Sequence, residues 1–180
     1  MERKSARLPG YILNRAQPGH WEADYMLFTR YGDNILVAQE RSTRLVLLAL
    51  PPNRKAPQTA TALAKLIGPW PPDMRHTLTV DNGTEFAHHY RLTRKLGIQT
   101  YFCDPHSPWQ KGGVENAIGR LRRALPRKTN LDTVSNDALD KLVSKYNNTP
   151  RKCLGFQTPA ETFLQPLHFK CESTPQPALG

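Results

Sequence analysis

The sequence predicts an α/β domain with a mixed sheet of five strands, three antiparallel strands first and two parallel strands after them. Two observations support this fold class. Three segments rich in β-branched and other apolar residues follow one another closely in the first third of the chain, and helix-like and strand-like segments then alternate. With 180 residues, of which 38% are hydrophobic, the chain is long enough to bury the core of one domain.

The first half of the predicted sheet is a meander of three strands. Strand-like segments lie at 20–28, 34–40 and 44–50, and short polar turns separate them. Turns of this length join antiparallel neighbours, so the three strands are expected to pair in chain order. Pro51 and Pro52 end the meander, because proline has no N–H group to donate to a sheet.

The second half alternates helices with two further strands. Apolar residues at helical spacing before Gly68 predict a crossover helix, which leads to a strand that ends at Asp81. A crossover helix joins parallel strands, so the later strands are expected to be parallel. The remaining elements are a short helix around 86–96, a strand at 98–103, a helix at 113–125 and a last helix whose apolar face runs from Ala138 to Tyr146.

The composition favours a polyanionic partner. The chain has 25 Lys and Arg against 15 Asp and Glu, a net charge of +10, which is typical of proteins that bind nucleic acid or an anionic surface. The longest apolar run, at 45–50, is too short to span a membrane, and the N-terminus shows no secretory signal, so a cytoplasmic protein without a membrane partner is expected. Cys103, Cys153 and Cys171 are widely spaced, which argues against a disulfide framework and a zinc site.

Acidic residues far apart in the sequence are expected to come together. Glu22 and Asp24 are two positions apart on the first strand, so both leave the same face of the sheet and either could be a ligand on geometry. Asp81 ends a strand expected beside the first one, although Asp81-Asn82-Gly83 is also good turn chemistry. Glu115 opens a helix after two glycines that permit close backbone approach. Carboxylates without nearby Cys or paired His suit Mg²⁺ or Mn²⁺, and two such ions would support phosphodiester attack.

Four segments carry a resemblance to a known family: "GHWEADYM", "TVDNGTEF", "FCDPHSPWQKGGVENAIGRLRRALPRKTNL" and "NNTPRKCLGFQTPAE". In order and spacing they resemble the integrase-core domain of bacterial DDE transposases, most closely the insertion-sequence-thirty family. The resemblance runs from about Gly19 to Phe163. It implies a ribonuclease H-like fold, of the kind found in retroviral integrases.

The resemblance also implies a site and an activity. Asp24, Asp81 and Glu115 match the family's catalytic triad, which binds two Mg²⁺ or Mn²⁺ ions per active site, and Arg122 matches the basic residue usual after the glutamate. Asn116 is expected to give a supporting hydrogen bond, and Glu22 to support the ligands. The implied activity is hydrolytic nicking at the ends of an insertion sequence, followed by attack of the freed 3′-hydroxyl on target DNA. The implied partners are the transposon ends and the target DNA, and joining two ends implies a homodimer or a larger synaptic complex.

A basic stretch surrounds Glu115. From Lys111 to Lys128 the sequence holds six basic residues against one acid. Such a patch would bind phosphates of the DNA backbone, and the binding would weaken as salt rises. A solvated basic face is the alternative, which the spacing of Arg122 leaves open. The predicted DNA-binding residues are Arg122, Arg120, Arg123, Lys111, Arg127 and Lys128.

The expected domain organisation is a basic N-terminal extension at 1–18, an integrase catalytic core at 19–165 and a flexible C-terminal tail at 166–180. Full-length relatives carry a helix-turn-helix region that recognises the element ends, and 18 residues are too few to form one. Two alternative functions use the same residues: a ribonuclease H-like nuclease that cuts without joining, and an inactive or domesticated transposase remnant that only binds DNA. In each case the expected location is the bacterial cytoplasm, at the nucleoid.

Overall fold

A single mixed sheet forms the centre of the protein. The computed structural model describes residues 9–30, 32–104 and 107–172 of the chain. The five strands lie in the order β3-β2-β1-β4-β5. β1 pairs with β2, and β2 with β3, in antiparallel fashion, whereas β1 pairs with β4, and β4 with β5, in parallel. The predicted mixed sheet is confirmed. The strands are β1 (His20–Leu27), β2 (Asn34–Glu40), β3 (Val46–Ala49), β4 (Thr77–Val80) and β5 (Gln99–Phe102).

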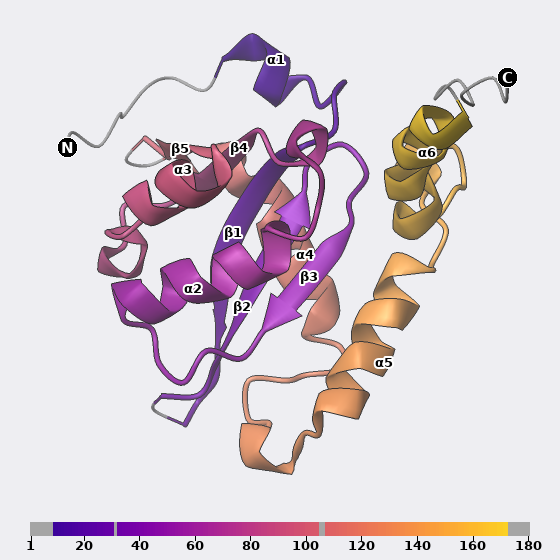
Figure 1. The fold of residues 1–180 in the computed structure, drawn as a ribbon. Helices are drawn as coiled ribbons and strands as arrows, with labels where there is room; N and C mark the ends of the chain where they lie inside the picture. Colours follow the sequence, from indigo (N-terminus) through magenta and orange to yellow (C-terminus); the bar gives the residue numbers. More distant parts are fainter. Residues whose placement is uncertain (1–8, 31, 105–106, 173–180) are drawn as a thin grey trace, which may run out of the picture.

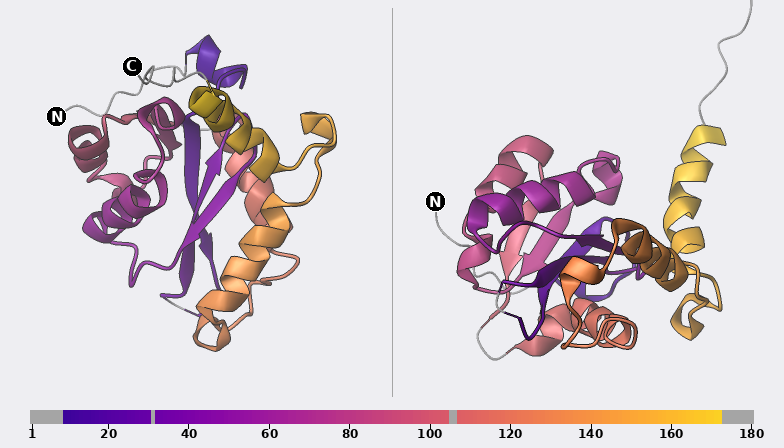
Figure 2. Two further views of the ribbon diagram at one scale, coloured as in Figure 1. Left: turned by 45° about the vertical axis from the view of Figure 1, so that its right-hand side comes forward. Right: turned by 90° about the horizontal axis from the view of Figure 1, so that it is seen from below.

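Helices cover both faces of this sheet (Figures 1 and 2). α2 and α3 lie on one face, and α4 packs against β1 and β2 on the other, with α5 along β3. The α-helices are α1 (Gly10–Leu13), α2 (Ala56–Ile67), α3 (Tyr90–Leu96), α4 (Gly112–Leu121), α5 (Asn136–Asn147) and α6 (Pro159–Glu172). Short 3₁₀ turns lie between them: η1 (Pro72–Met74), η2 (Thr84–Phe86), η3 (Pro108–Lys111), η4 (Leu131–Thr133) and η5 (Lys152–Leu154).

The alternation of side chains along β1 divides the core into two layers. Trp21, Ala23 and Tyr25 belong to the apolar cluster beneath α2 and α3, whereas Met26 belongs to the cluster beneath α4 and α5. Successive side chains on a strand point to opposite faces, so the even positions of β1 carry Glu22 and Asp24 toward α4. The expectation that these two acids share a face is confirmed by their contacts with residues that open α4.

Several elements are shorter than the sequence predicts, β3 and α4 among them. β3 begins at Val46 instead of residue 44, because Arg44 has a positive φ of 66° and its N–H bonds to the Glu40 carbonyl, which closes the turn after β2. α4 ends at Leu121 instead of residue 125, and turns follow up to Pro126. Proline disfavours the helical conformation of the residue before it, which accounts for an early end.

Near the C-terminus, the structure contains a helix, α6, that the sequence analysis does not predict. α6 runs through residues 166–172, where the sequence analysis places the start of a flexible tail; the rest of that tail, 173–180, lies outside the described residues. Thr158 and Glu161 form a capping box at its start, since Glu161 Oε2 accepts from Thr158 N at 2.8 Å and Thr158 Oγ1 from Glu161 N at 3.1 Å. Phe163 anchors the helix against Trp70, with ring centroids 4.8 Å apart. The expected extension at 1–18 contains α1, while residues 1–8 also lie outside the described part.

Within these described ranges, no helix has the length and apolar character needed to cross a bilayer.

Candidate active site

Two of the predicted acids meet at one lysine. β1 and β4 are parallel neighbours, with Glu22 opposite Thr79, so Asp24 and Asp81 reach the same end of the sheet. The Nζ atom of Lys111 lies 2.8 Å from Asp24 Oδ2 and 3.0 Å from Asp81 Oδ2. Burial alone would lower the pKa of Lys111, but the hydrogen bonds and charges of Asp24 and Asp81 outweigh it and raise that pKa. The sequence predicts the convergence of the two aspartates but assigns Lys111 only to DNA.

The backbone fixes the second oxygen of each aspartate. Asp24 Oδ1 accepts a hydrogen bond from Tyr25 N at 2.8 Å, and Asp81 Oδ1 accepts one from Gly83 N at 2.9 Å. The Asp81 bond closes an Asx turn, so turn chemistry and site geometry are the same feature. One oxygen of each carboxylate is therefore held in place while the other faces the shared cation.

Glu115 stands apart from this pair. It is exposed on the first turn of α4 and lines an open groove of about 620 Å³ together with Asp24 and Arg122. Asp24 is thus common to the lysine contact and to the groove. In the described ranges, no group of three or more His, Cys, Asp or Glu side chains is arranged to hold a metal ion. The structure brings Asp24 and Asp81 together at Lys111. Glu115 shares only the lining of the groove with Asp24.

Known proteins are similar to this chain in sequence and in fold. The transposase for insertion sequence element IS1086 of Cupriavidus metallidurans is 39% identical over 166 residues, which is 88% of this chain and 47% of that protein. Transposase InsI for insertion sequence element IS30A of Escherichia coli is 37% identical over 150 residues, 83% of this chain and 39% of that protein. This chain is a homologue of IS30-family transposases. It spans less than half the length of these two relatives.

The fold agrees with this assignment. The crystal structure of the catalytic core domain of BIV integrase matches with a TM-score of 0.64 and 27% identity, over 85% of this chain and 98% of that one. The expected ribonuclease H-like fold of an integrase core is therefore confirmed. No family model matches the chain.

Glu22 anchors α4 on the sheet. Its side chain is fully buried, pairs with Arg41 Nη1 at 2.6 Å and accepts from Val114 N at 2.8 Å. Burial raises the pKa of Glu22, and the charge of Arg41 and the Val114 bond oppose that rise. A Cβ added at Gly113 would lie 2.8 Å from Glu22 Oε2, so glycine is required there for close approach, as the sequence predicts. The alternative in which Glu22 is itself a ligand is disfavoured, because these contacts occupy its carboxylate.

The predicted basic stretch divides between two sides of α4. Arg122 and Arg127 line the groove of Asp24 and Glu115. The guanidinium of Arg122 lies 4.8 Å from the ring centroid of Phe28, and its Nη2 donates to the carbonyl of Leu27. Burial lowers the pKa of Arg122, and the charge of Arg127 adds to that effect. Arg120 instead lines a separate pocket, and Arg123 and Lys128 are exposed.

Asn116 contacts the helix backbone. Its Nδ2 atom donates to the Gly112 carbonyl at 2.8 Å, one turn earlier in α4. Among the described residues, Asn116 gives Glu115 no hydrogen bond, so the expected supporting role of Asn116 stays a prediction.

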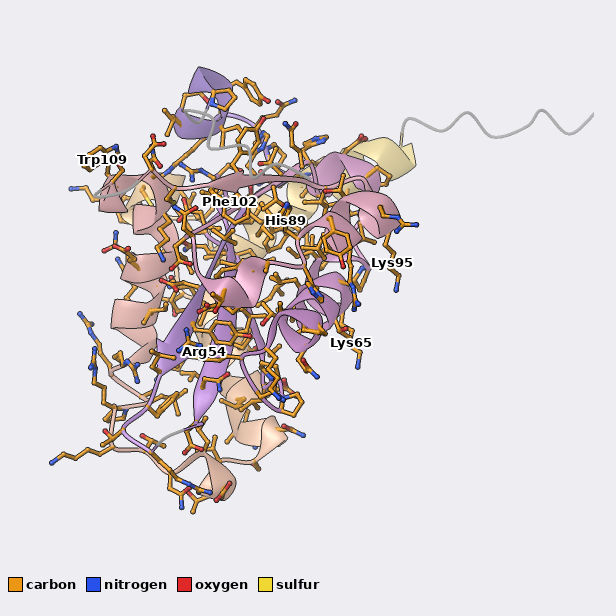
Figure 3. The ribbon with its side chains drawn as sticks, turned by 90° about the vertical axis from the view of Figure 1, so that its left-hand side faces the viewer. Arg54, Lys65, His89, Lys95, Phe102 and Trp109 are labelled. Atoms are coloured by element: carbon orange, nitrogen blue, oxygen red, sulfur yellow. The ribbon has the colours of Figure 1, made fainter. Side chains whose placement is uncertain are left out.

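Trp21 and Trp109 differ in environment. Trp21 is fully buried and donates from Nε1 to the Met74 carbonyl at 2.8 Å, so it packs in the core. Trp109 is 68% exposed in η3, and Figure 3 shows its side chain projecting outward, far from His89 and Phe102. The 3₁₀ turn before α4 leaves Trp109 outside the core.

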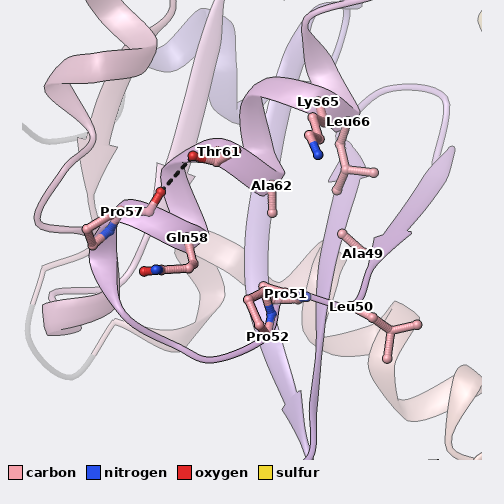
Figure 4. A pocket seen from close by; sticks show the side chains of 10 residues that line it. All are labelled: Ala49, Leu50, Pro51, Pro52, Pro57, Gln58, Thr61, Ala62, Lys65 and Leu66. Carbon is pink, nitrogen blue, oxygen red and sulfur yellow. Dashed lines mark hydrogen bonds between the residues drawn. The ribbon is translucent and has the colours of Figure 1, made fainter.

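A second groove differs from the groove of Asp24 and Glu115 because no carboxylate lines it. It measures about 390 Å³ and lies between the end of β3 and α2 (Figure 4). Its lining is mostly apolar, with Pro51, Pro52 and Leu66 and the single charged side chain of Lys65. Without a carboxylate in its lining it offers no hard anionic ligand for a divalent ion, unlike the groove of Asp24 and Glu115.

Proposed function

We propose that this chain is the catalytic domain of an insertion-sequence transposase, with its core at 19–165, that cuts DNA strands and joins them to target DNA in a metal-dependent reaction. The observation that carries the proposal is the convergence of Asp24 and Asp81 on one cation, the Lys111 ammonium. It is supported by homology to insertion-sequence transposases and by the likeness to a retroviral integrase core. The net charge of +10 suits a DNA partner, whose location would be the bacterial nucleoid.

The donor set fits Mg²⁺ or Mn²⁺. Two carboxylate oxygens already lie within 2.8 and 3.0 Å of a single positive atom, so the backbone holds them at a separation that a small cation can share. Glu115 supplies a third hard oxygen donor across the groove. Asp24, Asp81 and Glu115 would hold the two ions, and Lys111 would have to leave its present position. When bound, such ions activate the attacking oxygen and stabilise the leaving one in phosphoryl transfer.

The surrounding residues bind and orient the DNA strand. The groove between Asp24 and Glu115 would receive the scissile phosphate, and Arg122 at its other end would hold a neighbouring phosphate with its guanidinium. Lys111, once released from the aspartates, carries a positive charge beside the same phosphate. Holding the strand in this way converts a bimolecular encounter into an oriented reaction.

Two successive reactions follow from this arrangement. In the first, water attacks the scissile phosphorus, a P–O bond to the leaving oxygen breaks, and a free 3′-hydroxyl remains. In the second, that hydroxyl attacks a phosphorus of target DNA, and the displaced target oxygen leaves as a new 3′-hydroxyl. Each step exchanges one P–O bond for another, so no separate energy source is required. Joining two ends in one event would require a homodimer or a larger synaptic complex.

The deciding experiment is an end-joining assay with labelled oligonucleotides. A duplex with a recessed, labelled 3′-hydroxyl is incubated with target DNA and Mg²⁺ or Mn²⁺, with wild type and with Asp24→Asn, Asp81→Asn and Glu115→Gln in parallel. Metal-dependent joining that all three variants lose supports the proposal. Nicking without joining would favour the nuclease alternative, and DNA binding without either reaction would favour the remnant.

A further inference from the structure

Four arginines converge on a pocket across α4 from the aspartates. The pocket measures about 230 Å³, and four different segments of the chain supply its basic side chains. They are Arg15, Arg44, Arg120 and Arg151. The rest of the lining is polar or small, and includes Gln39, Asn116 and Gly113. The sequence does not predict this cluster, because only Arg120 belongs to the basic stretch from Lys111 to Lys128.

Local structure holds these arginines in place. Arg15 and Arg44 both have positive φ angles, 56° and 66°, which cost a non-glycine residue free energy unless the surrounding structure compensates. Arg151 stacks on Tyr146, with its guanidinium carbon 4.4 Å from the ring centroid, and its Nη2 donates to the Tyr146 carbonyl at 3.0 Å. Its backbone N–H bonds to the Gln157 carbonyl at 2.9 Å, so the loop also positions this side chain. The cluster is therefore built into the fold.

The positive charge of the pocket is not balanced by protein carboxylates. In the part of the chain that the structure describes, none of the four arginines forms an ion pair. Glu22 acts on Arg15 through its charge but is itself paired with Arg41 at 2.6 Å. Glu40, at the base of the turn that contains Arg44, accepts hydrogen bonds from Ser42 and Thr43 inside that turn. The nearby acids are thus engaged elsewhere.

The electrostatics agree with the geometry. Burial lowers the pKa of Arg15, and the charge of Arg44 lowers it further. Burial also lowers the pKa of Arg151, and Arg120 adds to this effect. Guanidinium groups that repel one another in a partly enclosed space are stabilised by an anion between them.

The pocket is distinct from the groove of Asp24. With 3.6 residues per turn, Gly113, Asn116 and Arg120 form one face of α4, whereas Glu115 and Arg122 lie on nearly the opposite face. An anion bound at Arg120 therefore does not compete with a phosphate in the groove.

We propose that the arginine pocket binds backbone phosphates of a DNA strand at a position separate from the reacting phosphate. Guanidinium groups bind phosphate oxygens with paired N–H donors, and four of them match the repeated charge of a nucleic acid strand. The pocket offers no aromatic surface for base stacking among its described residues, because Arg151 covers the ring of Tyr146. It therefore holds the strand without reading its sequence. The choice of DNA as the ligand rests on the function proposed above.

The experiment compares two variants that remove equal charge. Arg15→Gln/Arg120→Gln changes the pocket, and Arg91→Gln/Arg94→Gln removes two exposed arginines from α3 as the matched control. Binding of inorganic phosphate and of a thymidine oligonucleotide is measured without divalent metal, by titration and by the arginine Nε–H signals in NMR spectra. The pocket variant should lose about 10-fold or more in oligonucleotide affinity, and the control less than about 2-fold. Losing two phosphate contacts should also make the slope of log affinity against log salt shallower by about 1.4.

Several outcomes would overturn the proposal. Equal losses in the two variants would show that only net charge matters. Retained oligonucleotide binding together with lost binding of a polyglutamate peptide would assign the pocket to an acidic protein. If the double variant fails to fold, the single Arg120→Gln change, at an exposed side chain, should still weaken oligonucleotide binding by about 3-fold, and no change would contradict the proposal.

Calorimetric titration of Mg²⁺ into wild type and Asp81→Asn separates this proposal from the proposed function. If the aspartates bind no metal but the arginine signals still respond to the oligonucleotide, the catalytic proposal fails and the pocket stands. If metal binds and the arginine signals do not respond, the pocket fails alone.

Discussion

Lys111 Nζ lies 2.8 Å from Asp24 Oδ2, so the protein carries its own cation at the carboxylates proposed to bind metal. The side chain of Lys111 is only 11% exposed, which makes this contact stronger than a surface ion pair. Its presence implies that the ammonium and divalent ions would compete for Asp24 and Asp81.

Lys111→Gln should strengthen Mg²⁺ binding and weaken the metal-free fold. Removal of the ammonium leaves Asp24 and Asp81 without their shared positive partner, so their repulsion should cost about 1–2 kcal/mol of unfolding free energy in EDTA. Mg²⁺ affinity should rise about 10-fold, since no internal cation has to be displaced. Calorimetry and urea unfolding measure the two effects. Lys128→Gln, at an exposed position of the same stretch, is the control and should change neither quantity; equal behaviour of the two variants would contradict the competition.

Asp81→Asn should abolish metal-dependent cleavage while DNA affinity is kept or slightly increased. An asparagine Oδ1 can still accept from Gly83 N, so the turn should survive, but the anionic ligand is lost. We expect cleavage to fall about 100-fold or more, with a thermal midpoint close to that of wild type. Gel-shift titration and a nicking assay on the same samples test this. Parallel loss of binding and cleavage would instead indicate a folding defect.

Arg41→Met should destabilise the protein by about 3–5 kcal/mol, because it leaves the buried carboxylate of Glu22 without its charge partner. Arg41 also donates to the carbonyls of Ile12 and Gln110, at 3.2 and 2.9 Å, so these acceptors would lose partners as well. The double variant Glu22→Gln/Arg41→Met should be less costly than the sum of the single changes. Urea unfolding of wild type, the two single variants and the double variant gives the coupling energy between Glu22 and Arg41. Additive losses of stability would contradict this coupling.

His20 should make stability fall in mild acid. Burial, the charge of His76 and the charge of Arg41 lower the pKa of His20 from 6.5 to about 4. A lowered folded-state pKa means that the unfolded chain binds the proton first, so the contribution is full above pH 6.5 and is lost as the pH falls toward 4. Other groups at this site are Glu40, whose carboxylate accepts from His20 N, and Thr77, which bonds to Nδ1 at 2.8 Å.

The measurement is the free energy of unfolding between pH 4 and 7.5 for wild type and His20→Gln. The variant should show a flatter curve across this window, since it has no proton to take up there. Identical slopes for the two proteins would exclude His20 as the source.

The sequence allows much of the sheet to be predicted, because strand periodicity and polar turns are local signals. β2 has the predicted bounds, and β1 differs by one residue at its end. The meeting of Asp24 with Asp81 was also predictable, since it follows from which strands are neighbours. The position of an aspartate on a strand does not show which cation it contacts. The contact with Lys111 depends on how η3 packs before α4.

Other features needed three-dimensional context. The capping box of Thr158 and Glu161 is visible in the sequence and could have predicted α6, but Phe163 becomes part of the core only through its contacts with Trp21 and Trp70. The arginine pocket joins positions 15, 44, 120 and 151, and no local pattern links them. Exposure of Trp109 likewise follows from the tertiary packing around its turn.

The bond from Val114 N to Glu22 fixes the first turn of α4 on the sheet. Sliding or lifting of this helix would break that bond and expose a buried ion pair, so whole-helix motion would be a costly way to assemble the proposed metal site. In the proposed site, Glu115 would join the aspartates through rotation about its side-chain bonds and withdrawal of Lys111. Such rearrangements are fast compared with domain motions, so the approach of metal and DNA, instead of a slow reshaping of the protein, would govern how soon the centre becomes competent.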